Sequence, residues 1–219
     1  MHSIYEFITG PLAWVAWGVL VFGSIYRLVS MYNLAKKKDA SSIHYMNWKN
    51  GLTSILNWMV PLRSLGWRSR PDVNIVTIIF HLSLFAVPIF LGGHIVLWEN
   101  YFGVTWWAMP NGVADTLTVA VILACCFFAW RRLTKPEVAF VTRPMDWLVL
   151  LVAAAPFVTG FICYHQLFAY ETMLVIHIVS GLLMLALIPF TRLSHMLFAP
   201  FTRAYMGSEF LGVRHAKDW

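Results

Sequence analysis

Five apolar stretches, each long enough to cross a bilayer as a helix, divide this sequence from one end to the other. They cover residues 11–34, 73–98, 112–130, 145–168 and 172–198. A helix needs about 20 apolar residues to span the hydrocarbon core, where the bilayer offers no partner to an unpaired backbone N–H or C=O group. The sequence therefore predicts an all-α integral membrane protein, with one membrane domain over residues 1–219 built as a five-helix bundle.

The composition also favours the membrane class. Hydrophobic residues make up 59% of the chain and charged residues 12%, with a mean hydropathy of +0.67. Soluble domains carry about 25% charged residues. The net charge of +6 is shared with many nucleic-acid-binding proteins, but here the basic residues lie in loops between apolar stretches. We therefore expect contact with membrane lipid and none with nucleic acid.

The distribution of basic residues predicts the orientation of the chain. All sixteen Lys and Arg residues lie in three segments, 27–70, 131–143 and 192–217. The N-terminus, the loop at 99–111 and the turn at 166–171 carry none. Because cytoplasmic loops collect Lys and Arg, we expect the N-terminus outside, the C-terminus in the cytoplasm, and a place in the bacterial inner membrane.

The long cytoplasmic segment at 35–72 contains a pattern of its own. Its middle part, residues 46–65, includes apolar residues such as Trp48, Leu52 and Trp58. The segment reads as an amphipathic helix lying on the cytoplasmic interface of the membrane. A docking surface for a partner protein is the alternative.

Three cysteines, Cys125, Cys126 and Cys163, all sit inside apolar stretches without a CxxC or CxxCH motif. This pattern argues against c-type haem, iron–sulfur clusters bound by this chain and structural disulfides. We interpret the cysteines as small buried apolar residues.

Four of the eight histidines, His81, His94, His177 and His195, fall in or at the ends of the second and fifth stretches. An ionisable side chain there is a functional-site hypothesis by default, and neutral imidazole is a common axial ligand of haem iron. Spans two and five run in opposite directions, so antiparallel packing pairs His94 with His177 on the outer side and His81 with His195 on the inner side. Two such pairs fit two haems b.

The spacing of these histidines gives mixed support. His177 and His195 are 18 residues apart, which is five whole helical turns, so they share one face of a continuous helix. His81 and His94 are 13 residues apart and differ by about 220° around an ideal helix. Pro88 lies between them and offers a kink or local unwinding as a correction. The alternative is four isolated histidines bonded to the backbone or to their neighbours.

Small residues flank two of the histidines. Gly92 and Gly93 precede His94, and Ser180 and Gly181 follow His177. They would allow a flat macrocycle to approach the backbone. Close helix packing is the competing explanation.

At these residues the chain resembles the gamma subunit of respiratory nitrate reductase, a family of membrane cytochromes b. The strongest likeness is in the C-terminal third: His177, the run Pro-Phe-Thr-Arg-Leu-Ser-His at 189–195, and Val-Arg-His at 213–215. Weaker likenesses occur at 22–27, 80–82, 93–94, 131–132 and 142–146. The resemblance covers nearly the whole chain.

The resemblance implies five spans and two haems b, with His81, His94, His177 and His195 as iron ligands and Gly93 beside the outer haem. It offers Arg27, Arg131 and Arg192 as partners of the haem propionates, with ordinary snorkelling of these side chains as the alternative. The implied activity is electron transfer between a quinone pool, menaquinone or ubiquinone, and a cytoplasmic iron–sulfur subunit.

Two departures from the nitrate reductase members concern the quinone and the partners. The spacing in span two is 13 residues rather than ten, and the outer loop lacks their lysine near the quinol site. That region offers Asn111, Asp115, His165 and His94 instead. The expanded segment at 35–72 favours relatives from sulfur and sulfate respiration, such as the high-molecular-weight cytochrome complex, where multihaem cytochromes c and other membrane subunits are partners.

Three rival interpretations remain open from the sequence. The chain could carry electrons without a quinone site of its own, or serve as a structural anchor. A transporter or proton channel would call for inverted repeats or intramembrane carboxylates, and the sequence has neither.

Overall fold

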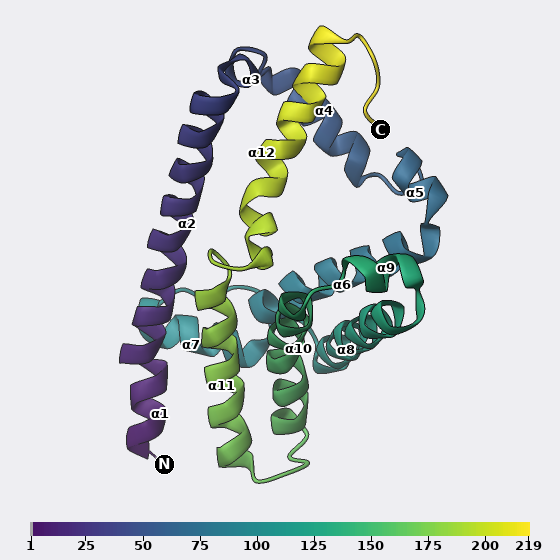
Figure 1. Ribbon diagram of the computed structural model, residues 1–219. Helices are drawn as coiled ribbons and strands as arrows, with labels where there is room; N and C mark the ends of the chain where they lie inside the picture. Colours follow the sequence, from purple (N-terminus) through teal and green to yellow (C-terminus); the bar gives the residue numbers. More distant parts are fainter. Residues whose placement is uncertain (1) are drawn as a thin grey trace. The chain divides into compact units, whose positions relative to one another are not determined.

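The computed structural model of the protein describes residues 2–219, apart from the side chains of Ser42 and Leu65, and over this range every regular element is helical. Figure 1 shows, in chain order, α1 (His2–Thr9), α2 (Pro11–Lys38), α3 (Ala40–His44), α4 (Trp48–Met59), α5 (Leu65–Ser69), α6 (Pro71–Phe90), α7 (Gly92–Phe102), α8 (Asn111–Thr134), α9 (Pro136–Val141), α10 (Pro144–Tyr164), α11 (Tyr170–Leu187) and α12 (His195–Gly207). A 3-10 turn, Arg192–Ser194, precedes α12, and a π-helical turn, Ser208–Val213, follows it.

Five helical segments are long and apolar enough to cross a membrane: His2–Lys38, Pro71–Phe90, Asn111–Thr134, Pro144–Tyr164 and Tyr170–Leu187. The prediction of an all-α chain with five apolar spans is thereby confirmed at this level. Two of the helices end well short of the sequence prediction. The second helix ends at Phe90 rather than at residue 98, and the fifth ends at Leu187 rather than at residue 198.

The helix break between α6 and α7 lies three residues beyond Pro88, and donors outside α6 satisfy the carbonyl groups that it exposes. Because the chain turns at Leu91, the carbonyl groups of residues 88–90 lose their helical partners. They accept hydrogen bonds instead from Nδ1 of His94 (3.0 Å), Nε1 of Trp106 (2.8 Å) and the backbone N–H of Met109 (2.9 Å). Residues of the loop between α7 and α8, together with His94, thus satisfy these carbonyl groups. Because the helix is interrupted between His81 and His94, the 220° offset of a continuous helix does not apply to them.

The break after α11 is centred on Pro189, which lacks the N–H that would continue the helix. The hydroxyl of Thr191 donates to the carbonyl of Leu187 (2.8 Å) and accepts from the N–H of Leu193 (3.2 Å), which closes α11 and begins the 3-10 turn. His195 is therefore the first residue of α12. The prediction that it shares a face of one continuous helix with His177 is wrong for this reason.

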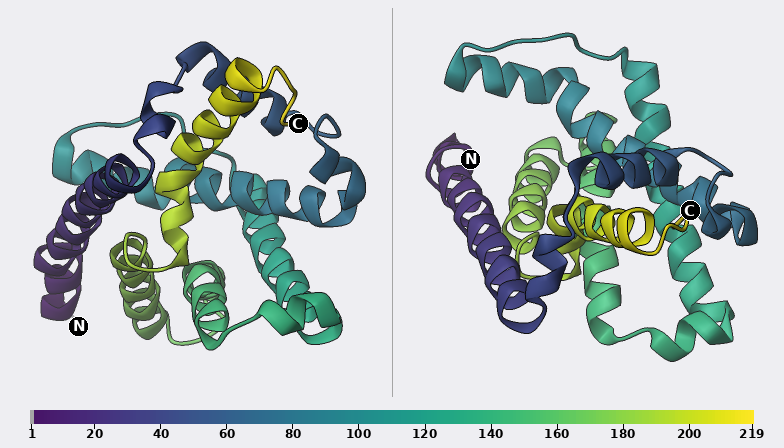
Figure 2. Two further views of the ribbon diagram at one scale, coloured as in Figure 1. Left: turned by 45° about the horizontal axis from the view of Figure 1, so that its top comes forward. Right: turned by 90° about the horizontal axis from the view of Figure 1, so that it is seen from above.

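The chain forms two compact units. One comprises residues 2–11 and 75–184, and its core lies where α8 meets α10, around Val87, Val121, Cys125 and Phe157. Figure 2 shows α9 as the short connection between α8 and α10. Small side chains on α8 allow this close packing of the two helices.

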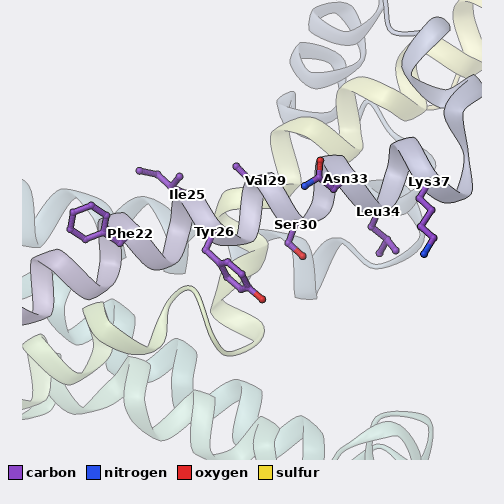
Figure 3. Close-up of a pocket in the computed structure, with 8 residues that line it drawn as sticks. All are labelled: Phe22, Ile25, Tyr26, Val29, Ser30, Asn33, Leu34 and Lys37. Carbon is purple, nitrogen blue, oxygen red and sulfur yellow. The ribbon is translucent and has the colours of Figure 1, made fainter.

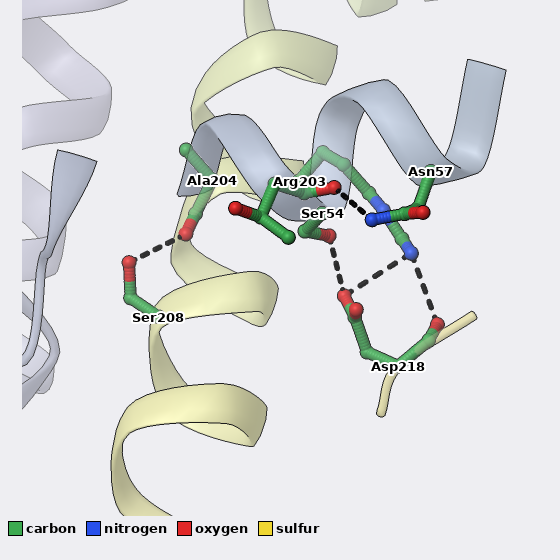
Figure 4. Close-up of polar contacts among 7 residues, drawn as sticks. Ser54, Asn57, Arg203, Ala204, Ser208 and Asp218 are labelled. Atoms are coloured by element: carbon green, nitrogen blue, oxygen red, sulfur yellow. Dashed lines mark hydrogen bonds and ion pairs between the residues drawn. The ribbon is translucent and has the colours of Figure 1, made fainter. Parts of the chain in front are cut away.

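The other unit comprises residues 12–74 and 185–219. In it α4 packs against α12, with Gly51 lying against Ala204. The C-terminal tail completes the contact: the carboxylate of Asp218 accepts a hydrogen bond from the hydroxyl of Ser54 (2.6 Å) and forms an ion pair with Arg203 (3.1 Å), as shown in Figure 4. The predicted interfacial helix is thus α4 alone, shorter than residues 46–65.

Candidate functional site

Two of the four span histidines lie side by side in the first unit. His94 is on the first turn of α7 and His177 is on α11, and their ring centroids are 6.0 Å apart with an angle of 5° between the ring planes. The sequence argument had placed these two residues in one pair. Their near-parallel rings are the structural feature around which the candidate site is built.

Each of these two rings is held by a backbone carbonyl. Nδ1 of His94 lies 3.0 Å from the carbonyl oxygen of Pro88, and Nδ1 of His177 lies 2.9 Å from that of Pro156. A carbonyl oxygen only accepts, so each Nδ1 carries the proton and each Nε2 of the neutral ring keeps a lone pair. Neither Nε2 has a hydrogen-bond partner among the described residues. This is the tautomer and anchoring that metal-ligating histidines use.

A glycine of α10 makes room for the His177 ring. A Cβ atom added at Gly160 would lie 2.8 Å from Cε1 and 3.0 Å from Nδ1 of His177. Any larger residue would push the ring away from the carbonyl that anchors it. Sequence reasoning missed Gly160, whose only signal is a glycine within an apolar span. A Cβ atom at Gly93 or Gly181 would meet nothing within 4 Å.

The spacing of the pair is compatible with two imidazoles that bind one metal ion from opposite sides. A metal–imidazole bond is about 2 Å long, so two imidazoles on opposite sides of one ion hold their ring centres roughly 6 Å apart. Aromatic rings in direct contact reach similar separations, so the anchored Nδ1 atoms carry more weight than the spacing. No cluster of three or more His, Cys, Asp or Glu side chains that could hold a metal occurs in the described chain. A haem needs only two protein donors, because its macrocycle supplies the rest.

The other two histidines show the same anchoring, each within its own unit. Nδ1 of His81 on α6 donates to the carbonyl of Thr77 (2.7 Å). Nδ1 of His195, at the start of α12, donates to the carbonyl of Arg192 (2.8 Å). In the neutral ring of each residue, the proton therefore lies on Nδ1 and the lone pair on Nε2.

Of the three arginines named from the sequence, Arg27 has the most distinctive surroundings. Its guanidinium lies over the ring of Phe198, 5.4 Å from the centroid, and its buried Nε has no hydrogen-bond partner among the described residues. A buried donor without a partner is costly, so this atom is suited to an anionic group. Arg192 contributes its backbone carbonyl to His195, as described above.

At the end of α8, Arg132 is a better candidate for binding an anionic group than Arg131. The guanidinium of Arg132 lies 5.9 Å from the ring centroid of Trp147, and its buried Nη1 has no hydrogen-bond partner within residues 2–219. The position of Arg132 around the helix could have identified it from the sequence. Arg132 follows the buried Cys125 by seven residues, about two turns, and so lies on the same face of α8.

The outer-end residues proposed for quinone form one close contact. Nε2 of His165, at the end of α10, lies 3.2 Å from Oδ1 of Asp115 on α8. The ring of Phe161 packs on His165 with centroids 4.4 Å apart. His165 is about 7.5 Å farther along α10 than Gly160, the residue that seats His177. Asn111 is the first residue of α8 and has no such contact with the pair.

A separate cavity of about 600 Å³ lies along α2, and Figure 3 shows its lining. It is open and formed by one helix, with none of the site residues named above among its lining residues: Phe22, Ile25, Tyr26, Val29, Ser30, Asn33, Leu34 and Lys37. It is therefore an exposed face of α2 rather than part of the histidine site.

Comparison with known proteins shows that the chain is similar to a bacterial protein over nearly its whole length. No family model matches the chain. A protein of Nitratidesulfovibrio vulgaris strain Hildenborough, described only as "Protein", is 36% identical over 212 residues, which cover 94% of this chain and 93% of the relative. The chain therefore belongs to the family of this N. vulgaris protein.

Proposed function

We propose that the protein is a di-haem cytochrome b subunit of a redox complex in the bacterial inner membrane, which transfers electrons across the membrane. The observation that carries the proposal is the pair His94 and His177, two near-parallel rings whose Nδ1 atoms are bonded to carbonyls and whose Nε2 atoms are unpartnered. His81 and His195 would hold the second haem.

The haem supplies one-electron chemistry when bound, and the chain supplies its environment. The carbonyls of Pro88 and Pro156 fix the rings of His94 and His177 and make their Nε2 atoms better donors. Arg27, Arg131 and Arg192, together with Arg132, are the cationic groups available to the propionates. The resemblance to membrane cytochromes b and the five apolar spans support this assignment.

A quinone completes the proposal. Oxidation of a hydroquinone releases two protons, and the contact between His165 and Asp115 provides a proton-accepting group near the outer histidine pair. His94 and Asn111 would border this quinone. The electrons would pass to an iron–sulfur subunit on the cytoplasmic side, or be exchanged with a multihaem cytochrome c on the outer side.

A redox difference spectrum with a pyridine haemochrome assay of the purified protein tests the proposal. We expect two protohaems per chain, one of them lost in His94→Ala and the other in His195→Ala. His165→Ala is the matched control, because this histidine bonds through Nε2 to a carboxylate, and it should retain both haems. Folded protein without haem, from haem-replete cells, would contradict the proposal.

An electron-transfer or anchor subunit without its own quinone site is the second candidate. This second candidate is favoured because the imidazole of His165 and the carboxylate of Asp115 are already each other's bonding partners. The two candidates differ in their response to quinone analogues. A shift of the outer haem spectrum on adding an analogue, abolished in Asp115→Asn, would support the quinone site, and the absence of any shift would favour the second candidate.

A further inference from the structure

Helix α4 is attached to its unit by its small and polar face. A Cβ at Gly51 would lie 3.0 Å from the Cβ of Ala204, and Ser54 contacts Gly207 and bonds to Asp218. Gly51, Ser54 and Asn57 are the buried residues of the helix. Helices on the surface of a soluble protein bury their apolar face, so α4 has the reverse orientation.

The opposite face of α4 is apolar and exposed. Trp48, Leu52, Leu56 and Met59 are 75%, 48%, 54% and 60% exposed. They recur at intervals of four, four and three residues, within an arc of about 80°. We call these four residues the outer face of α4. An apolar stripe of this kind marks an interaction site rather than an ordinary protein surface.

The surroundings of the outer face are uniformly basic. Residues 46–70 contain Lys49, Arg63, Arg68 and Arg70 and no Asp or Glu. The ammonium group of Lys49 lies 5.8 Å from the ring centroid of Trp48. Nε of Arg68 donates to the carbonyl of Leu62 (3.1 Å), which keeps this cation next to an exposed leucine. Positive charge thus borders the apolar stripe.

The unit is also tied to the end of α2. The hydroxyl of Tyr205 on α12 is hydrogen-bonded to Asp39, directly after the basic run Lys36, Lys37, Lys38 that ends α2. Burial and the carboxylates of Glu209 and Asp39 raise the pKa of this phenol. Lysines at the end of an apolar span favour the bilayer surface, so this contact would bring α12, and α4 with it, near the lipid headgroups.

We propose that the outer face of α4 docks on anionic phospholipid of the bilayer that the chain itself crosses. Tryptophan and aliphatic side chains would enter the boundary between headgroups and acyl chains, and Lys49, Arg63 and Arg68 would bind the phosphate groups. The basic surroundings favour an anionic lipid surface over a second copy of the chain, which would bring like charges together. The inference goes beyond the proposed electron-transfer function and depends only on insertion in a bilayer.

Power-saturation electron paramagnetic resonance of a spin label at Leu52→Cys tests the docking. The full chain, with its three native cysteines changed to alanine, is placed in nanodiscs of phosphatidylcholine with or without phosphatidylglycerol. In the anionic discs we expect the label to collide with oxygen rather than with a water-soluble nickel chelate. Lys217→Cys is the control position, because it lies beside Asp218 on the opposite side of α4, and its label should report water.

The next variant replaces Lys49, Arg63 and Arg68 with glutamine. It should lower the ratio of docked to undocked α4 on the order of a hundredfold, because each lost charge lowers that ratio about fivefold. Neutral discs should weaken docking in the same direction. Access of the nickel chelate to position 52 equal to that at position 217 in anionic discs would overturn the proposal. Equal protection of position 52 from the nickel chelate in neutral and anionic discs would also overturn the proposal. So would protection only in discs that hold two copies of the chain.

Discussion

At the scale of single residues, a backbone carbonyl determines which ring nitrogen of each span histidine carries the proton in the neutral form. His81, His94, His177 and His195 all donate from Nδ1 to such a carbonyl. His165 differs, because its Nε2 faces the carboxylate of Asp115. The sequence singles out these four histidines as candidates, but it could not predict this tautomer, since the accepting carbonyl is up to 21 residues away in the chain.

Under the proposed function, Gly160→Ala should abolish binding of the haem proposed at His94 and His177 while leaving α10 intact. The new methyl group would collide with Cε1 of His177 and displace the ring from the carbonyl of Pro156. Alanine stabilises a helix by about 1 kcal/mol relative to glycine, so unfolding of α10 would not explain a loss. Haem per chain from the pyridine haemochrome assay should fall from two toward one.

The control for this change is Gly181→Ala on α11, where a Cβ meets open space. It should keep both haems. Equal haem content in the two variants would contradict the role assigned to Gly160.

Asp218→Ala should loosen the attachment of α4. It would leave the guanidinium of Arg203 buried without its carboxylate, and breaking a buried ion pair costs about 3 kcal/mol or more. Backbone amides of α4 should then exchange faster with deuterated solvent, by up to roughly a hundredfold. The exposed pair of Glu209 and Arg214 gives the comparison, and Glu209→Ala should change α4 exchange by less than about tenfold.

At the scale of elements, three prolines inside apolar spans have different outcomes. Pro156 remains within the continuous helix α10, whereas α6 ends two residues after Pro88 and α11 ends before Pro189. The two breaks have hydrogen-bond donors nearby. Trp106 and Met109 satisfy carbonyls at the end of α6, and Thr191 satisfies one at the end of α11. Composition predicted the spans correctly, but these donors are fixed by tertiary structure, so the two breaks could not be predicted.

Trp106→Phe should destabilise the junction between α6 and α7. It removes the donor to the carbonyl of Ile89, an exposed hydrogen bond whose loss should cost about 0.5–1.5 kcal/mol. Thermal unfolding in detergent should show a lower midpoint than for the wild-type protein. The neighbouring Trp107 is 66% exposed, and Trp107→Phe should leave the midpoint nearly unchanged. Equal effects of the two changes would contradict the role of the Trp106 hydrogen bond.

At the scale of the whole molecule, the basic residues predict which ends face the cytoplasm. A single cysteine at Lys217 should react with a membrane-impermeant maleimide only after the inner face is opened, and one at Val104 should react in intact cells. Both residues are exposed. Labelling of Lys217→Cys from outside in intact cells would reverse the assigned orientation.

The hydrogen bond between His94 and Pro88 ties the end of a helix to the orientation of an imidazole ring. Nδ1 of His94 satisfies a carbonyl that the break after α6 leaves without a helical partner. Any movement of this ring therefore exposes a backbone acceptor, and any change in the path of the chain at the break moves the ring. The junction of α6 and α7 and the direction of Nε2 are for this reason mechanically coupled.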